Sequence, residues 1–325
     1  MTTTNENLRR ADIAMATFEA NGGLLQPEQA NTFIDYVLEE PTILKQARVE
    51  RMNAPEKKIS RFGFGTRILR AASQTGGAED DGTNGRYLKK ADRSAPTNTQ
   101  LTLTSSEVIA EVRLPYEFFE DNLEGQSIEQ RIMRGIAAQA AIDLEEFSLW
   151  ADTTLGVDPL APEYDAYLGL QDGWMKRVGA SHVVDNASAG INPDLFANAL
   201  IGMPQKYLNR LAQMRAFVSV ANRIKYQQKV ATRVGGFGDS AVQSDPTKPT
   251  FAYGLQVEAA QSMVWNSQSG KGLITFPKNL IFGIRRDITV ETDKDIRSRE
   301  YIIVLTARVG LQVDDIDCSV ALKNI

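Results

Sequence analysis

The chain has 325 residues, of which 42% are hydrophobic and 24% are charged, and its formal net charge is −5. This composition is that of a globular protein with apolar material for one large or two modest cores. The slight acidity disfavours a protein whose main task is to grip nucleic acid, because that task requires clustered Lys and Arg. One cysteine and one histidine exclude an internal disulfide and a tetrahedral zinc site.

Residues 1–57 alternate short amphipathic helical pieces with breaks at Asn21-Gly22-Gly23 and at Pro41. Phe33 and Val37 lie on one face of the second piece. The first residues lack the pattern of a secretory signal, and no apolar run is long enough to predict a membrane span. A segment of this kind has no core of its own, so we expect it to lie across another surface.

Residues 58–104 predict a long hairpin. The stretch "ISRFGFGTRILRAAS" alternates bulky with small or polar residues, and the stretch that begins "LTLTSSEVIAEV" has Thr, Val, Ile and Leu at strand spacing. Between them lies a segment rich in Gly, Asp, Asn, Ser and Pro. We expect a projecting arm that cannot bury itself, and the alternative is a disordered loop.

Residues 127–151 predict one long helix. Apolar residues recur every four positions, and Ser127 can cap the first turn. At about 1.5 Å per residue the helix would be roughly 35–40 Å long. The cluster "AAQAA" at residues 137–141 indicates that another element packs close to its middle.

The remaining chain predicts mixed elements. Residues 153–190 read as irregular, a helix begins at Asn192-Pro193, and the strand "RAFVSV" runs into a second helix. From residue 251 onward the sequence predicts mostly strands.

Candidate catalytic groups are sparse. His182 and Asp185 share a loop with Ser181, but a triad is defined by geometry, so we expect a surface or loop histidine. Cys318 is expected to be buried in a terminal strand. The acidic group Asp314, Asp315 and Asp317 lacks the Gly and terminal Glu of an EF-hand loop, which favours a solvated turn.

We predict structural roles, and not catalytic ones, for the charged residues elsewhere in the chain. Glu145 and Glu146 are adjacent on the long helix, cannot act jointly, and are expected on its polar face. Four arginines lie beside acidic residues and predict ion pairs within or between subunits. They are Arg285, Arg286, Arg297 and Arg299. No catalytic, cofactor-binding or metal-binding residue is predicted.

The order of these parts resembles the major capsid protein of tailed bacteriophages, which has the HK97-type fold. "VRLPYEFFEDNLEGQSIEQRIMRGIAAQAAIDLEEFSLWAD" is similar to the strand, acidic turn and spine helix of that family. "LFANALIGMPQKYLNRLAQMRAFVSVANRIKYQQKV" resembles its axial-domain helix and strand, and "LIFGIRRDITVETD" with "REYIIVLTARVGLQVDDIDCSVALK" resembles its long peripheral strands.

The resemblance implies an α+β fold with an N-terminal arm, an extended β-hairpin loop, a peripheral domain with a long spine helix, and an axial domain. The implied boundaries are 1–57 for the N-arm, 58–104 for the extended loop, 105–159 and 281–310 for the peripheral domain with its helix at 127–151, and 160–280 and 311–325 for the axial domain.

The implied function is self-assembly into an icosahedral head shell around double-stranded DNA, in a virion assembled in the host cytoplasm. The implied partners are other copies in hexamers and pentamers, the portal, and separate scaffolding or decoration proteins, with DNA contacted non-specifically and neither membrane nor cofactor. Apolar residues without a core of their own would be buried only against neighbouring subunits. These are Phe33, Val37, Phe62, Phe64, Ile68 and Leu69. Lys89 and Lys90 could reach a neighbour, but ordinary solvated lysines are expected.

Three alternatives stay open. An encapsulin-like compartment has the same fold and stores protein cargo instead of DNA. A soluble α/β enzyme of unknown chemistry would form a small oligomer with a pocket of perturbed ionisable groups. A tail or portal component would form rings or tubes.

Overall fold

The computed structural model describes residues 41–64, 68–69, 96–115, 126–159, 164–179, 182–231, 250–264 and 270–325. These residues form a mixed α+β fold with three sheets. The described chain divides into two compact units. The smaller unit is Glu56–Leu103, and the rest of the described chain forms the larger unit.

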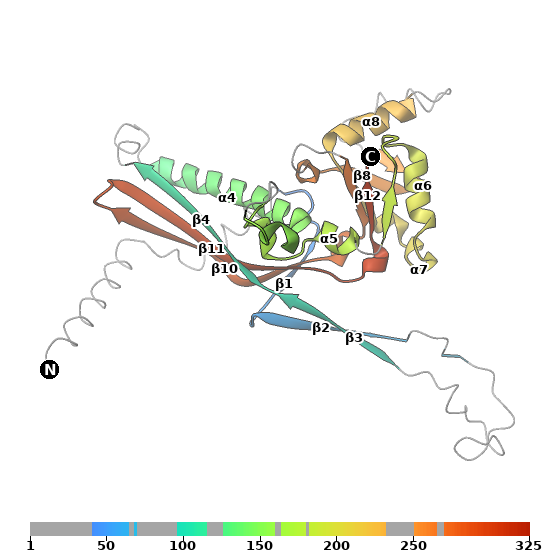
Figure 1. The fold of residues 1–325 in the computed structure, drawn as a ribbon, viewed down its shortest axis with the longest axis horizontal. Helices are drawn as coiled ribbons and strands as arrows, with labels where there is room; N and C mark the ends of the chain where they lie inside the picture. The colour runs from blue at the N-terminus through green and yellow to red at the C-terminus, as the bar shows by residue number, and fades with distance from the viewer. Residues whose placement is uncertain are drawn as a thin grey trace, which may run out of the picture. The chain divides into compact units, whose positions relative to one another are not determined.

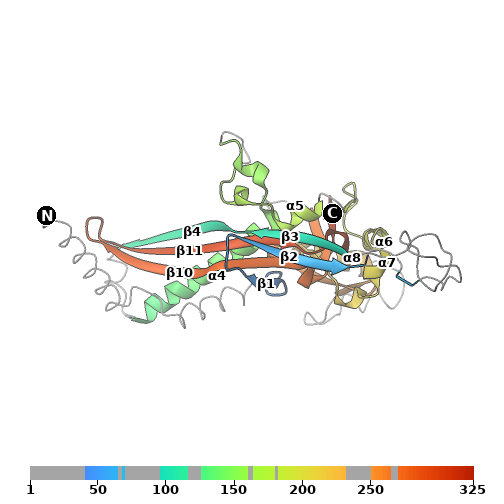
Figure 2. The same cartoon turned by 90° about the horizontal axis from the view of Figure 1, so that it is seen from below.

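A four-stranded sheet in the order β1-β10-β11-β4 runs through the larger unit. The antiparallel strands β10 and β11 pair from Leu280↔Val313 to Asp295↔Glu300, and β4 pairs antiparallel with β11. Figure 2 shows β4, β11 and β10 side by side. The strands are β1 (Arg48–Arg51), β4 (Ser106–Pro115), β10 (Leu280–Asp295) and β11 (Glu300–Val313).

Residues 48–51, which were expected in the N-arm, form β1 and pair in parallel with β10 at Ile281–Ile284. A strand of four residues is too short to give a reliable alternation signal, and its partner lies far away in the sequence. The pairing therefore depends on tertiary context that local pattern does not contain.

The long helix α4 (Gln126–Trp150) covers one face of this sheet, and its bounds differ by one residue from the prediction. Figure 1 shows α4 running alongside the long strands. Ala137 and Ala141 are fully buried, whereas the predicted apolar stripe at Ile132 and Ile136 is only half-buried. Small side chains let the helix backbone approach the sheet closely, as the alanine cluster predicted.

Glu145 corrects the expectation of a polar helix face. The residue is only 3% exposed, and its Oε2 accepts hydrogen bonds from the backbone N–H groups of Ile43 (3.0 Å) and Leu44 (3.1 Å). The Ser262 hydroxyl donates to Oε1. A carboxylate can be buried when charge-assisted hydrogen bonds replace its water, and here the donors come from about 100 residues away in the sequence.

A six-stranded sheet in the order β5-β12-β9-β6-β8-β7 forms the other part of the larger unit. Its strands bury both faces, because alternate residues point to opposite sides. Phe217 and Leu273 belong to the core beneath α4, whereas Val218 and Ile274 belong to a second core. The strands are β5 (Val183–Asp185), β6 (Arg215–Val218), β7 (Thr250–Ala252), β8 (Leu255–Ala259), β9 (Lys271–Thr275) and β12 (Val320–Lys323).

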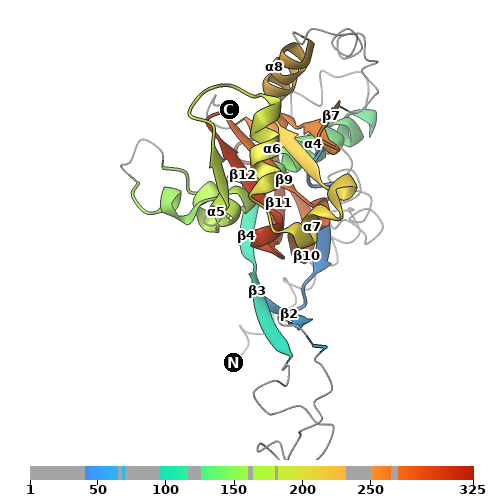
Figure 3. The ribbon, with the colours of Figure 1, turned by 90° about the vertical axis from the view of Figure 1, so that its right-hand side faces the viewer.

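Helices α6 and α8 contribute to the second core, and the rings of Phe196 and Tyr226 join them edge to face at 5.3 Å. Figure 3 views these helices against the sheet. The strand-to-helix order of β6 and α8 confirms the prediction. The described α-helices of this part are α5 (Trp174–Gly179), α6 (Pro193–Ile201), α7 (Gln205–Leu208) and α8 (Val220–Ala231).

The start of α6 confirms the prediction that a helix begins at Asn192-Pro193. Asn192 is the N-cap, its Oδ1 accepts a hydrogen bond from the Leu195 N–H at 2.8 Å, and Pro193 occupies the first turn. The helix ends at Ile201 with Gly202 as its C-cap, and α7 follows as a separate short helix. Caps of this kind are local, so sequence alone predicts them.

Short 3₁₀ turns join the remaining elements. One of them contains Cys318, which is buried as expected but lies before the terminal strand β12 instead of within it. These turns are η2 (Thr153–Gly156), η3 (Leu168–Leu170), η4 (Leu211–Gln213), η5 (Gln261–Met263), η6 (Pro277–Asn279) and η7 (Ile316–Cys318).

The smaller unit contains the two-stranded sheet of β2 (Glu56–Gly63) and β3 (Thr97–Thr104). The predicted second hairpin strand is divided, because residues 101–104 lie in β3 whereas the residues from Ser106 onward form β4 of the four-stranded sheet. Along β2 half-buried residues alternate with exposed ones. A two-stranded sheet is marginally stable by itself, so this unit has little apolar burial to hold it.

Replacing Glu145 with Ala should destabilise the folded subunit by about 3 kcal/mol, because two buried N–H groups lose their acceptor. Chemical denaturation of the two proteins would measure the difference in the free energy of unfolding. The control is Glu146→Gln at the adjacent residue. Burial, with repulsion from Asp143 and Asp165, raises the pKa of Glu146, so a neutral isostere should cost little there. Equal losses for both variants would contradict the assignment.

Candidate subunit-contact surfaces

Four of the predicted contact residues lie exposed in the smaller unit. Phe62 is 70% exposed and Leu69 is 83% exposed, with Phe64 and Ile68 each at least half exposed. The rings of Phe62 and Phe64 meet edge to face, with centroids 5.7 Å apart. Large exposed apolar side chains that lie together, as these two rings do, commonly mark an interaction surface. Phe33, Val37, Lys89 and Lys90 lie outside the described residues.

A polar row crosses the four-stranded sheet on the side opposite α4. Arg308 stands directly across from Glu107 on β4 and from Arg286 on β10. Two arginines in direct register repel each other, and one carboxylate between them offsets this repulsion. Glu107 Oε2 lies 2.7 Å from Arg308 Nη2, and Glu107 Oε1 lies 3.4 Å from Arg286 Nη2.

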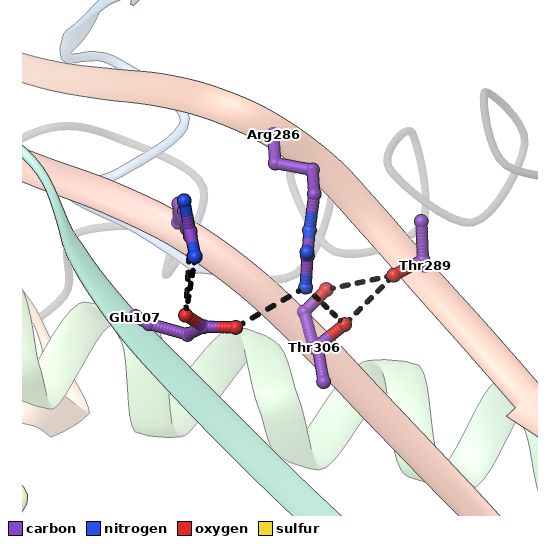
Figure 4. A network of polar contacts seen from close by, with 5 residues as sticks. Glu107, Arg286, Thr289 and Thr306 are labelled. Atoms are coloured by element: carbon purple, nitrogen blue, oxygen red, sulfur yellow. Dashed lines mark hydrogen bonds and ion pairs between the residues drawn. The ribbon is translucent and has the colours of Figure 1, made fainter. Parts of the chain in front are cut away.

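The same row continues into two threonines (Figure 4). Arg286 Nη2 donates to Thr306 Oγ1 at 2.6 Å, and that hydroxyl lies 2.8 Å from the hydroxyl of Thr289. The network stabilises the long strands at the place where the β10–β11 register shifts, between Ile284 and Thr289. Arg286 therefore forms an ion pair within the subunit, and Arg285 adds a further positive charge near Glu107.

The hydrogen bond from Arg308 holds the pKa of Glu107 below its ordinary value, and the charges of Arg308, Arg286 and Arg285 act in the same direction. Because the folded state lowers this pKa, the stabilisation is present above the ordinary value and is lost as the pH falls through the folded value. The pair is solvent-exposed, so it orients the strands more than it stabilises the fold.

Arg297 and Arg299 lie in the turn between β10 and β11. The Arg297 N–H donates to Asp295 Oδ1 at 2.8 Å, and this hydrogen bond is the main reason that the pKa of Asp295 is lowered. Arg299 adopts a positive φ of 56°. Ile296, directly before Arg297, is 84% exposed. The sequence analysis did not predict this, because a single isoleucine within a charged stretch carries no periodic signal.

Other exposed apolar residues were not predicted from the sequence as contact candidates. Ile109 on β4 is exposed, as are Phe251 and Tyr253 at the β7–β8 hairpin. Tyr253 and Gly254 both have positive φ angles, of 51° and 84°, as a two-residue hairpin turn requires. Tyr-Gly is not the usual Asn-Gly pair, so the turn was not recognised.

The residues considered for catalysis do not converge. His182 lies before β5, and its Nδ1 is buried without a hydrogen-bond partner. Asp185 accepts instead from the Ala187 N–H (2.8 Å) and from Asn324 Nδ2 (2.9 Å). Asp315 accepts from the hydroxyl of Tyr207 and caps η7.

The described residues place two further bounds on the site. Within residues 41–325 and outside the gaps, no group of three or more His, Cys, Asp and Glu side chains could hold a metal ion. Among the helices that the structure describes, none is long and apolar enough to cross a membrane.

Comparisons with solved structures define the fold. No family model matches the chain. A chain of the satellite phage P4 procapsid, a structure that includes the size determination (Sid) protein, is similar over 100% of this chain and 98% of its own, with a TM-score of 0.65 and 12% identity. The structure from Microbacterium phage Oxtober96 has a TM-score of 0.59 and 15% identity over 87% of this chain and 90% of its own. The fold is thus the HK97-type fold of phage capsid proteins.

One relative identifies the family. The protein named "Putative prophage capsid protein YqbE" from Bacillus subtilis (strain 168) is 34% identical over 329 residues, which cover 98% of each chain. The chain belongs to the phage capsid protein family.

Replacing Arg308 with Met should raise the pKa of Glu107 more than replacing Arg285 with Met, because Arg308 donates hydrogen bonds to the carboxylate whereas Arg285 acts on it through charge alone. Carboxyl NMR titration of the soluble subunit would measure both pKa values. The Arg308→Met subunit should also show a weaker loss of thermal stability as the pH falls below about 4.5, the ordinary pKa of a Glu side chain. An unchanged Glu107 pKa in Arg308→Met would contradict the geometry.

Proposed function

We propose that this chain is the major shell subunit of a phage head, and that copies of it assemble through hexamers and pentamers into a closed icosahedral shell around double-stranded DNA. Membership of the phage capsid family supports the general role. The proposal includes no catalytic step, and it places the mature protein in the virion after assembly in the host cytoplasm.

The observation that carries the proposal is the exposed apolar surface of the smaller unit. Phe62, Phe64, Ile68 and Leu69 are all at least half exposed in the single chain. Burying one such side chain completely contributes about 1.5–3 kcal/mol. Four of them would give at most on the order of 6–12 kcal/mol per contact, because each is already partly buried.

That gain is close to the cost of association. Two molecules lose about 4–15 kcal/mol of translational and rotational freedom when they join. One contact of this size would therefore hold a pair weakly. A subunit that repeats the contact with several neighbours in a closed lattice would be held strongly, because later contacts form within the same particle. The surface thus suits a shell better than a dimer.

The domain division follows the same proposal. We assign the strands β4, β10 and β11 with α4 to a peripheral domain, and the six-stranded sheet with α6, α7 and α8 to an axial domain. The segment around α5 packs with the core of the first group through Trp174 and Val178, although the sequence reading placed it in the axial domain. The segment Glu56–Leu103 corresponds to the extended loop.

The charge of the chain suits a container for DNA. A formal net charge of −5 disfavours tight binding of packaged DNA, so contacts would be weak and non-specific. Portal, scaffolding and decoration proteins remain proposed partners on family grounds.

An encapsulin-like compartment is the alternative with a structural basis. The holo-SrpI encapsulin complex of Synechococcus elongatus PCC 7942 is similar over 86% of this chain, with a TM-score of 0.51 and 11% identity. The contents of the isolated particles distinguish a phage head from an encapsulin-like compartment. Particles isolated from the native host should contain nuclease-protected double-stranded DNA, and a packed protein cargo without DNA would favour the compartment.

Replacing Phe62 and Phe64 together with Ser should leave a folded, soluble subunit and should raise the concentration needed for assembly at least tenfold. Tenfold corresponds to about 1.4 kcal/mol, which is less than the apolar burial expected from two phenylalanines. Size-exclusion chromatography with light scattering, beside negative-stain electron microscopy, would measure this.

The matched control is Val157→Ser, which removes an apolar side chain directly after η2 that is 77% exposed in the larger unit. It should assemble as the unchanged protein does. Normal assembly of the Phe62→Ser/Phe64→Ser protein would refute the role assigned to the smaller unit.

A further inference from the structure

Two neighbouring connections carry the chain between the four-stranded and six-stranded sheets. The first is η6, which joins β9 to β10. The second is residues 314–319 with η7, which join β11 to β12. The angle between the two sheets depends on how these two connections are held against each other.

Asn279 fastens one connection to the other. Its side chain accepts a hydrogen bond from the Asp315 N–H at 2.7 Å and donates to the Asp315 carbonyl at 2.7 Å and to Ser319 Oγ at 2.9 Å. Its carbonyl accepts from the Asp314 N–H at 2.8 Å, and its own N–H donates to the Phe276 carbonyl at 2.8 Å. Every polar group of this buried residue therefore forms at least one hydrogen bond.

The hydrogen bonds continue on both sides of Asn279. Ser319 Oγ lies 2.7 Å from Thr275 Oγ1, and both residues are fully buried. The hydroxyl of Tyr207 on α7 donates to the Asp315 carboxylate. One polar network therefore joins the end of β9, both connections and a helix of the six-stranded part.

Trp174 on α5 holds the same two strands just beyond the connections. Its indole N–H is shared between the carbonyls of Ile281 on β10 (3.3 Å) and Gln312 on β11 (3.1 Å). The pair of strands is thus fixed where it leaves the four-stranded sheet and again where it enters the six-stranded sheet.

Apolar packing alone would not define the angle, because it is non-directional. A buried polar network that is fully satisfied does define it, since any other arrangement leaves buried donors or acceptors without partners. We infer that Asn279 is a positioning residue that fixes the angle between the two sheets and thereby the curvature of the assembled shell. The curvature part of this inference rests on the proposed function.

The angle can be tested in the single subunit. Dyes would be attached at Lys225→Cys on α8 and Ile296→Cys at the β10–β11 turn, both exposed, in a Cys318→Ala background. Single-molecule energy transfer at picomolar concentration excludes assembly. Asn279→Ala should shift or broaden the distribution of transfer efficiency.

Asn192→Ala is the matched control, because it removes a hydrogen-bonded asparagine that caps α6 and whose side chain bonds to Leu195 of that helix. It should destabilise the fold and leave the distribution unchanged. If Asn279→Ala does not fold, Ser319→Ala removes one part of the network and should broaden the distribution by a smaller amount. A folded variant of either residue with the distribution of the unsubstituted protein would overturn the inference.

The consequence for curvature is measured on particles. The unsubstituted chain should give shells of one diameter, Asn192→Ala should give the same diameter, and Asn279→Ala should give mixed diameters or sheets that do not close. Uniform Asn279→Ala shells of the original diameter would refute the link to curvature and leave the proposed function standing. Absence of shells from the unsubstituted chain, both alone and with native lysate, would refute the proposed function, while the energy-transfer experiment still tests the angle.

Discussion

The packing of α4 against the long strands is the interaction on which the larger unit depends. Fully buried Ala137 and Ala141 bring the helix close to a sheet in which β10 and β11 pair along almost their whole lengths. This packing buries one face of the sheet and leaves the row of Glu107, Arg286 and Arg308 on the other. Because β10 and β11 also lead to β9 and β12, the same two strands join the two cores.

Two buried polar side chains then fix the relative arrangement of elements that apolar packing alone leaves undefined. Glu145 holds the turn at Ile43 and Leu44 onto α4, and Asn279 holds the two inter-sheet connections together. Apolar contacts supply most of the stability, whereas these hydrogen bonds select one arrangement of the parts. A subunit that must fit the same neighbours many times needs a defined arrangement more than it needs a reactive group.

Features encoded locally could be predicted from the sequence. The bounds of α4, the Asn192 cap with Pro193, and the passage from β6 to α8 all depend on residues within a few positions of one another. The burial of Glu145, the pairing of β1 with β10 and the network of Asn279 depend on partners far away in the sequence. Local pattern cannot contain such partners, so Glu145 was placed on a polar face and Asn279 was not noticed. The exposed phenylalanines were found because a hairpin without a core cannot bury them.

The central claim is that copies of this chain build a closed shell by themselves or with the proteins of their own phage. The most direct measurement is negative-stain electron microscopy of the full chain, expressed alone and together with native lysate, beside its size-exclusion profile. Closed particles tens of nanometres across are the expected result. A discrete dimer or hexamer that never grows under either condition would contradict the account.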